Sequence, residues 1–265
     1  MVIDSKNEEM SHRLIVLGAS NVAKSLEVLL NVAPQMMPKP LEVYAAIGRG
    51  RSYGASSKFL FRGLPGILES ELWPVLENRT SSAETSCVIT DVGNDLLYDQ
   101  SVDQIIDWVQ QCIIRLRQTE GRIAITGIPL SCVRSLASYK FTAFRTMMFP
   151  KSRLQLQTVR DRAEALDVRL QELASDDDIT FIPQKPDWYG FDPIHWKQAK
   201  RPEVWHTILN ALGHQAFNYS SVRSSFFHSI RHWGTRPASR TLFGMKQTKA
   251  QPSIHRGEHL TVALY

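Results

Sequence analysis

A serine, an aspartate and a histidine stand where they could form a nucleophilic site. Ser20 lies in the stretch GASNVAKS, directly after the apolar run 13–17, so it should sit where a strand meets a helix. A serine hydroxyl is a weak nucleophile that needs a base, which a third group must orient. Asp192 and His195, in the stretch FDPIHW, are three residues apart and could hydrogen-bond to each other. Together they have the composition of a Ser–His–Asp triad.

Groups that could stabilise an oxyanion follow other apolar runs. The main-chain N–H of Ser20 would lie at the positive end of a helix dipole. Asn94, three residues beyond the run 86–91, offers an amide donor. The glycine-rich loop GRGRSYGASS, after the run 41–48, offers glycine N–H groups that no side chain shields. These donors and the triad residues predict acyl transfer to a serine.

The same stretch GASNVAKS also supports a different prediction. It matches the phosphate-binding pattern G-x-x-x-x-G-K-[ST] except for Ala23, which stands where glycine normally lets the backbone approach phosphate. Lys24 and Ser25 would then be the phosphate and magnesium contacts, and Asp91, which ends the run CVITD, would help to hold the metal. Ala23 counts against this nucleotide-binding alternative, but the sequence leaves it open.

The elements that must position these residues alternate between strand and helix patterns. Apolar runs predict strands at 13–18, 41–48, 86–91, 121–129 and 179–183. Helical periodicity is found at 23–33, 58–70, 102–116 and 154–174, and a last helix is predicted after the FDPIHW stretch. Such alternation is typical of a doubly wound α/β domain with five parallel strands, in which ligands bind beyond the carboxyl ends of the strands.

Four short motifs, in this order, resemble the four blocks of the SGNH (GDSL-type) hydrolases: GAS, a glycine after the second strand, GND and DPIH. The resemblance spans about residues 13–213. It implies a flavodoxin-like sandwich fold and hydrolysis of carboxylic esters or thioesters without a metal or cofactor. Some members transfer acyl groups, so an acyltransferase, or a catalytically inactive binding module on the same fold, remains an alternative.

Carried over by position, the resemblance implies Ser20 as nucleophile, His195 as base and Asp192 as the group that orients it. The oxyanion hole would consist of the Ser20 N–H, the Asn94 side chain and the N–H of either Gly50 or Gly54. Two positions depart from the family pattern, namely Ala19 for Asp in the first block and Val92 for Gly in the third. The second block is lengthened, and three of its side chains could line the substrate site, those of Arg49, Arg51 and Tyr53.

Charge divides the 265-residue chain, whose net charge is +5, into two parts. Residues 204–265 contain seven Lys or Arg and one acid, Glu258, whereas the rest is close to neutral. We therefore expect a hydrolase-like domain over 10–215 and a basic extension over 216–265. The extension could contact nucleic acid or an anionic surface, but its aromatic residues favour packing onto the body, with disorder around 246–256.

The remaining features indicate a cytoplasmic protein that acts on a small ester or acyl substrate. No apolar run is long enough to span a membrane, and the polar N-terminus lacks the pattern of a signal peptide. Three cysteines without C-x-x-C spacing predict neither disulfides nor a metal site. An apolar wall over the site is expected in the segment 129–150, from Phe144, Met147, Met148 and Phe149.

Overall fold

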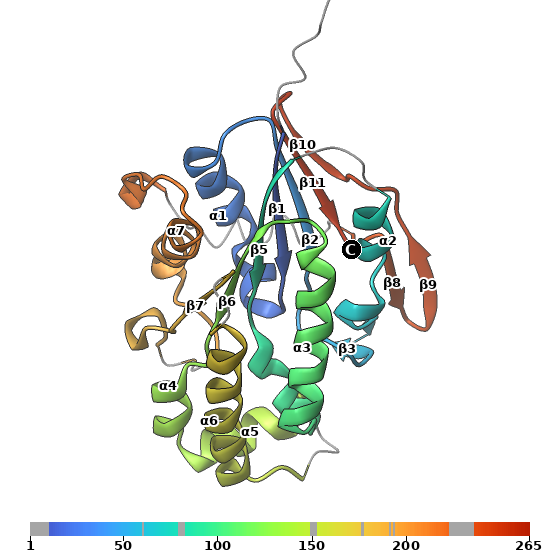
Figure 1. The fold of residues 1–265 in the computed structure, drawn as a ribbon. Helices are drawn as coiled ribbons and strands as arrows, with labels where there is room; N and C mark the ends of the chain where they lie inside the picture. The colour runs from blue at the N-terminus through green and yellow to red at the C-terminus, as the bar shows by residue number, and fades with distance from the viewer. Residues whose placement is uncertain are drawn as a thin grey trace, which may run out of the picture.

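The computed structural model describes residues 11–59, 61–78, 83–148, 153–175, 178–190, 192, 194–222 and 236–265. A central sheet of seven strands, in the order β10-β11-β2-β1-β5-β6-β7, runs through the molecule (Figure 1). Five of them are the predicted parallel strands, β1 His12–Leu17, β2 Leu41–Ala46, β5 Glu84–Ile89, β6 Arg122–Thr126 and β7 Ile179–Ile182. The α/β fold class and the parallel pairing of β1 with β5 are confirmed.

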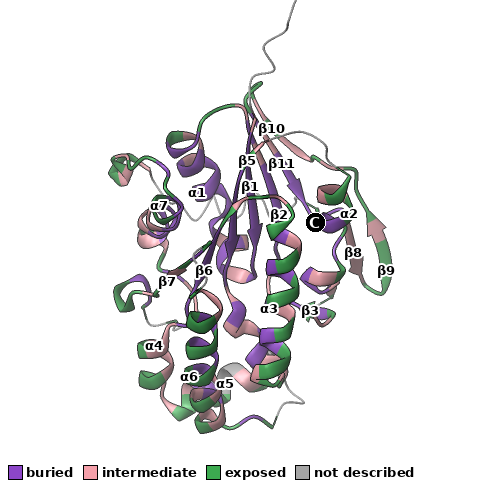
Figure 2. Cartoon of the chain, in the orientation of Figure 1, coloured by how far each residue is buried: buried purple, intermediate pink, exposed green. Residues whose placement is uncertain are grey.

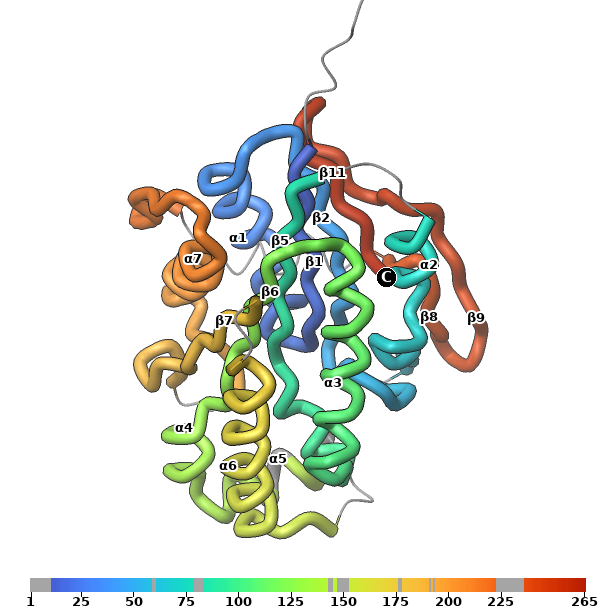
Figure 3. Tube along the Cα trace, viewed as in Figure 1, coloured from blue at the N-terminus to red at the C-terminus, as the bar shows by residue number. Residues whose placement is uncertain are grey.

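Two further strands from the end of the chain make the sheet wider than predicted. β11, Leu260–Leu264, pairs in parallel with β2, so that Leu260 lies beside Leu41. β10, Ile254–Arg256, pairs antiparallel with β11 at the sheet edge. Figure 3 shows the red end of the chain beside the blue β2. The central sheet therefore has seven strands rather than five, because a distant segment adds to its edge.

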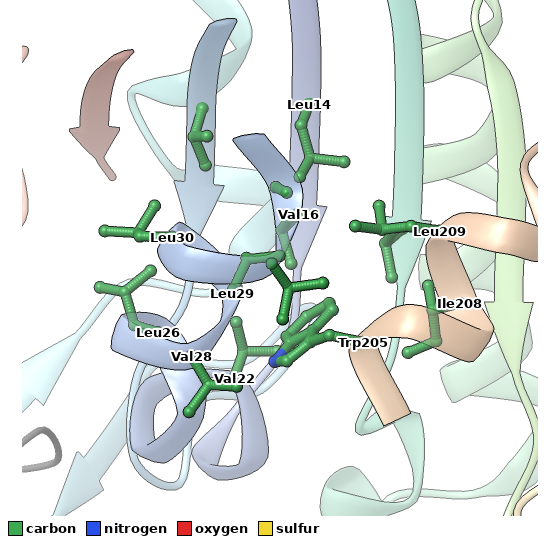
Figure 4. Close-up of a cluster of buried hydrophobic side chains, with 14 of the residues drawn as sticks. Leu14, Val16, Val22, Leu26, Val28, Leu29, Leu30, Trp205, Ile208 and Leu209 are labelled. Carbon is green, nitrogen blue, oxygen red and sulfur yellow. The ribbon is translucent and has the colours of Figure 1, made fainter. Parts of the chain in front are cut away.

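Helices cover both faces of the sheet. On one face lie α1, Ser20–Met36, and α7, Arg201–Ala211, which enclose an apolar cluster with β1 and β2 (Figure 4). On the other face lie α2, Leu72–Glu77, α3, Val102–Arg117, and α6, Leu156–Leu173. The buried central strands are purple in Figure 2, between helices with exposed outer surfaces. Two shorter helices, α4 Leu130–Ser135 and α5 Ser138–Met148, precede α6.

Two of the predicted helices differ in the structure. The first was expected to stop before Pro34, but α1 continues through this residue to Met36, with apolar side chains buried along its length. The segment predicted as a helix over 58–70 instead forms β3, Ser57–Phe59, β4, Arg62–Leu64, and the short turn η1, Ile67–Glu69. Gly63, Pro65 and Gly66 interrupt that segment, and each disfavours a helix interior.

β3 and β4 belong to a second, smaller sheet that includes part of the C-terminal segment. Its strand order is β3-β4-β8-β9, where β8 is Ser239–Leu242 and β9 is Met245–Thr248. The expectation of disorder around 246–256 was wrong, since most of β9 and all of β10 fall in that range. Arg256 of β10 donates to Asn31 of α1 at 3.0 Å, so the segment is fastened to the body. The domain boundary near 215 stays a prediction.

None of the helices in the described part of the chain is both long and apolar enough to span a membrane.

Candidate functional site

Four loops meet at the carboxyl ends of the central strands. Ser20 is the first residue of α1, directly after β1. Asn94 lies in the short helix η2, Val92–Tyr98, which follows β5. Gly50 and Gly54 lie in the loop after β2, and His195 lies between β7 and α7. Since adjacent parallel strands end at the same edge, the sheet brings these separate stretches together.

The three predicted triad residues form one hydrogen-bonded chain. The Oγ of Ser20 lies 2.9 Å from Nε2 of His195, and Nδ1 of His195 lies 2.6 Å from a carboxylate oxygen of Asp192. The tautomer that fits has its proton on Nδ1, which donates to Asp192 and leaves Nε2 to accept from Ser20. The His195 side chain is 19% exposed and that of Asp192 is 54% exposed, so the base is sheltered while the carboxylate borders solvent.

The backbone around Asp192 fixes its carboxylate. One oxygen of Asp192 accepts the main-chain N–H of Ile194 at 3.0 Å and that of His195 at 3.3 Å, while the other faces the His195 ring. Burial alone would raise the pKa of Asp192. The hydrogen bond and charge of His195, the Ile194 N–H and the positive charge of Lys24 outweigh it and lower that pKa to about 2. Asp192 therefore carries its negative charge at neutral pH.

Asp91 holds the segment around Ser20, a role that the sequence analysis missed. Its carboxylate accepts the main-chain N–H groups of Ala19 at 3.0 Å and Asn21 at 2.9 Å, and the Asn21 side-chain amide at 2.7 Å. Burial raises the pKa of this carboxyl above its usual value, although the hydrogen bonds from Asn21 and Ala19 oppose the shift. The N–H groups on either side of Ser20 are therefore occupied, whereas no partner of the Ser20 N–H itself is found among the described residues.

Asn21 also connects the serine to the histidine loop. Its side-chain amide donates to the carbonyl of Ile194 at 3.0 Å, and its side-chain oxygen accepts the N–H of Trp196 at 2.9 Å. The two contacts flank His195. Asn21 thus fixes the loop on both sides of the imidazole against the start of α1. The only sequence signal for this residue was its place directly after Ser20.

The predicted oxyanion donors lie in two adjoining segments. The Asn94 side-chain amide donates to the carbonyl of Arg51 at 2.9 Å, and the Tyr98 hydroxyl donates to the carbonyl of Gly50 at 2.5 Å. Gly50 has a φ of 68°, in the left-handed region that favours glycine. Gly54 instead packs against α3, where an added Cβ would lie 2.0 Å from the Trp108 ring. The two positions therefore favour glycine for different reasons, a backbone turn at Gly50 and a close contact at Gly54.

Arg51 and Tyr53 were expected to line the substrate site, but both are fully buried. The Tyr53 hydroxyl donates to the carbonyls of Leu17 and Thr90, at the ends of β1 and β5. Arg51 donates to the carbonyls of Pro65, at 3.1 Å, Ile47, at 3.3 Å, and Tyr265. Burial lowers the pKa of this guanidinium to about 9. The buried side chains of Arg51 and Tyr53 therefore anchor the loop after β2 to the core.

Asp95 supports the same loop from the η2 side. It is fully buried and accepts the Ser52 hydroxyl and, at 3.0 Å, the main-chain N–H of Tyr53. Burial raises the pKa of Asp95 to about 6, although these hydrogen bonds oppose the shift. The sequence analysis placed Arg51 at the substrate site rather than beneath this loop, because the partners of its guanidinium lie far away in the chain.

The phosphate-loop alternative does not fit the local geometry. Ser25 is fully buried, where it donates to the carbonyl of Asn21 at 2.6 Å and accepts the indole N–H of Trp205 at 2.9 Å. Its hydroxyl is therefore enclosed in the core rather than directed at a metal. Asp91 occupies two N–H groups that a phosphate would need. In the GASNVAKS stretch, the N–H groups at the start of α1 therefore bind the carboxylate of Asp91 rather than a phosphate.

Positive charges accumulate beside the triad. Burial lowers the pKa of Lys24 to about 8, with the charges of Arg49 and Arg201 acting in the same direction and those of Asp192 and Asp91 against it. Arg201 also donates to the carbonyl of Lys24 at 2.9 Å.

Of the apolar wall predicted over the site, Phe149 and the side chains of Phe144, Met147 and Met148 lie outside what the structure describes. No group of three metal-ligating side chains is found in the described ranges.

Comparisons with known proteins find similar solved structures only. No protein-family model and no curated protein matches the chain. The psychrotrophic esterase EstA from Pseudoalteromonas sp. is 12% identical, with a TM-score of 0.48, over 76% of this chain and 97% of that one. TesA is 15% identical, with a TM-score of 0.47, over 76% and 98%. A GDSL-like lipase from Bacteroides thetaiotaomicron is 10% identical, with a TM-score of 0.46, over 76% and 87%. The resemblance of the chain to the SGNH (GDSL-type) hydrolases rests on its motifs GAS, GND and DPIH.

Proposed function

We propose that this protein is a serine hydrolase that cleaves carboxylic ester or thioester bonds. The observation that carries the proposal is the continuous hydrogen-bonded chain from Ser20 through His195 to Asp192, with contacts of 2.9 and 2.6 Å. A helix-capping serine would bond to its own helix, yet the α1 cap is Ala19, without a side-chain hydrogen bond, and the Ser20 hydroxyl faces His195. This arrangement suits an activated nucleophile.

In the first half of the reaction, Ser20 Oγ attacks the carbonyl carbon of the ester while Nε2 of His195 takes the hydroxyl proton. The ring then carries a positive charge, which the ionised Asp192 stabilises through Nδ1–H. As the tetrahedral intermediate collapses, the bond to the leaving oxygen or sulfur breaks. His195 returns the proton to the leaving group, and an acyl-Ser20 ester remains.

The negative charge of the tetrahedral oxygen needs donors already in place. We assign these to the N–H of Ser20, the N–H of Gly50 and the second amide hydrogen of Asn94, whose other hydrogen serves Arg51. Gly50 is preferred to Gly54 because its left-handed turn adjoins Asn94 through Arg51, whereas Gly54 packs against Trp108. In the second half, water attacks the acyl-serine with the help of His195, releasing the acid and restoring Ser20.

Active-site labelling tests the proposal. The intact protein should react with a fluorophosphonate to give one adduct, located by mass spectrometry at Ser20, and it should hydrolyse a short p-nitrophenyl ester. Ser20→Ala should lose both the label and the activity. Ser175→Ala, which removes an exposed hydroxyl that donates to the carbonyl of Glu172 at the end of α6, serves as the matched control and should keep both.

The outcomes separate the proposal from its alternatives. A label that persists in Ser20→Ala would contradict the assignment of the nucleophile. If the protein neither reacts with the fluorophosphonate nor hydrolyses esters, although its circular dichroism shows it folded, the binding-module alternative would replace the proposal. A thermal shift with Mg-ATP in place of labelling would revive the nucleotide alternative.

A further inference from the structure

One end of the small sheet presents an unusual group of apolar side chains. Phe61, Phe243 and Met245 are 66%, 66% and 64% exposed. They are half of the six large apolar side chains that stand out to solvent in the described part of the chain; the others, Ile114, Tyr139 and Val168, lie on separate helices. Single exposed apolar residues are common on protein surfaces, but a cluster of three at one tip indicates an interaction site.

The sheet geometry brings the three side chains together. Phe61 follows β3 in the turn toward β4, and Phe243 lies in the turn between β8 and β9. β4 pairs with β8, so the two turns lie side by side, and the N–H of Phe243 donates to the carbonyl of Phe61 at 2.9 Å. The two rings stack with their centroids 4.9 Å apart. We call this group, with Met245 at the start of β9, the aromatic tip.

The backbone of the aromatic tip is strained in a way that stability alone does not explain. Phe243 and Gly244 form a two-residue hairpin turn with φ values of 50° and 82°. Asparagine or glycine normally fills the first position, because a bulky side chain is disfavoured at positive φ. Phe243 adopts this unfavourable conformation although it remains 66% exposed, so burial of its ring does not compensate for the cost. Strain held at an exposed position is typical of a residue kept for binding.

Positive charge surrounds the aromatic tip. The strands and turns of the small sheet, 57–64 and 239–248, contain four basic residues and no acid: Lys58, Arg62, Arg240 and Lys246. Burial, together with the charges of Arg240 and Arg49, lowers the pKa of the Arg62 guanidinium, as expected where like charges gather. Two copies of such a surface repel each other, which disfavours self-association. A partner surface that complements the aromatic tip would therefore be apolar at its centre and negatively charged at its rim.

We propose that the aromatic tip docks on an anionic lipid surface, with Phe61, Phe243 and Met245 entering the boundary between headgroups and acyl chains and the four basic residues facing lipid phosphates. Aromatic side chains favour that boundary, and Lys and Arg near it are attracted to anionic lipids. In Figure 1 the β8–β9 turn points toward the lower edge of the view, as do the carboxyl ends of β1 and β5. Docking would therefore place the site end of the molecule toward the membrane.

Vesicle co-sedimentation of the full chain tests this proposal. The protein should bind vesicles of phosphatidylcholine with phosphatidylglycerol, bind pure phosphatidylcholine at least tenfold more weakly, and dissociate as salt rises. Phe61→Ser/Phe243→Ser should weaken binding at least tenfold. Ile114→Ser/Val168→Ser removes two exposed apolar side chains from α3 and α6 and should leave binding unchanged. Lys246→Glu should weaken binding, whereas Lys39→Glu, at another exposed position, should not.

Two further measurements separate docking from loss of fold and from the proposed hydrolase activity. Phe61→Ser/Phe243→Ser should keep the wild-type unfolding midpoint, so that lost binding cannot be attributed to unfolding. Vesicle binding should persist in Ser20→Ala, because docking does not depend on the proposed hydrolase activity. The proposal is overturned if wild type does not bind anionic vesicles, or if both double variants lose binding equally. It is also overturned if the aromatic tip instead mediates a concentration-dependent dimer in analytical ultracentrifugation, or binds only an acidic polypeptide.

Discussion

Asn21 donates two hydrogen bonds to the carboxylate of Asp91, from its main-chain N–H at 2.9 Å and from its side-chain amide at 2.7 Å. Because Asn21 directly follows Ser20 and also contacts Ile194 and Trp196, this pair connects the end of β5 to both halves of the proposed triad. The distance between nucleophile and base therefore depends on residues that do not take part in the chemistry.

Asn21→Ala should lower kcat by about 10- to 100-fold with little change in KM, because small misplacements of catalytic groups slow the chemical step. Steady-state kinetics on a p-nitrophenyl ester would measure the split. Asn78→Ala, which removes an exposed amide that donates to the carbonyl of Pro74 in α2, serves as the control. A raised KM with an unchanged kcat would mean that Asn21 binds substrate rather than positioning His195.

Asp192→Asn should lower kcat by roughly 10²- to 10⁴-fold, because an amide can neither stabilise the imidazolium by charge nor hold its tautomer. With the pKa of Asp192 lowered to about 2, the wild-type carboxylate keeps its charge throughout the pH range of ordinary assays. Loss of activity on acidification down to pH 4 should therefore not come from Asp192. A kcat within twofold of wild type in the purified variant would contradict its role.

Asp95 should make the fold less stable as pH rises from about 4 to about 6. Its pKa is raised to about 6 when folded, against roughly 3.9 when unfolded, so the folded state binds more protons within this window. The free energy of unfolding should accordingly fall by at most about 3 kcal/mol between these pH values. Urea unfolding at pH 4, 5 and 6 would measure it. Asp95→Asn should flatten the dependence, and an equally steep slope in that variant would assign the effect elsewhere.

Gly54→Ala should destabilise the protein by about 1 to 3 kcal/mol, because the new methyl group overlaps the Trp108 ring. Trp108→Ala in the same chain should recover part of that loss, since the second change removes the obstacle. A double-mutant cycle of unfolding free energies would show the coupling. Additive losses would mean that the two residues do not touch in solution.

Arg51→Leu should reduce both stability and turnover. The variant deprives the carbonyls of Ile47, Pro65 and Tyr265 of a buried donor, which should cost about 2 to 5 kcal/mol. It should also loosen the main chain that Asn94 contacts, with kcat falling by about tenfold. Arg169→Leu, at a half-exposed guanidinium of α6, is the control for denaturant unfolding and kinetics. An unchanged kcat in the folded Arg51→Leu variant would contradict the inference that Arg51 positions the main chain that Asn94 contacts.

The residues of the proposed triad could be predicted from the sequence because each one lies in a loop that follows a strand. Short apolar runs ended by Gly18 or Asp91 marked the strands, and parallel strands bring such ends together. Ser20, Asp192 and His195 were named for this reason, and the structure places them in contact. Their roles in catalysis stay predictions until the labelling experiment.

The residues that the sequence analysis missed act through partners distant in the chain. Arg51 was expected to line the substrate site, but its guanidinium is enclosed by carbonyls from three segments, the last of them at Tyr265. Neither periodicity nor spacing encodes such a contact. The small sheet was missed for a related reason. β4 is three residues long, and its partner β8 lies far along the chain, so only the tertiary pairing identifies it as a strand.

The parallel pairing of β11 with β2 sets a condition on biosynthesis. Leu41 leaves the ribosome early, but its neighbour Leu260 is made only after the intervening chain, which at roughly 5 to 20 residues per second takes on the order of tens of seconds. Throughout that interval one edge of β2 has no strand to pair with, and an open edge invites pairing with other chains. A chain that terminates before Leu260 cannot form this pairing, so that edge of β2 stays available to strands of other chains.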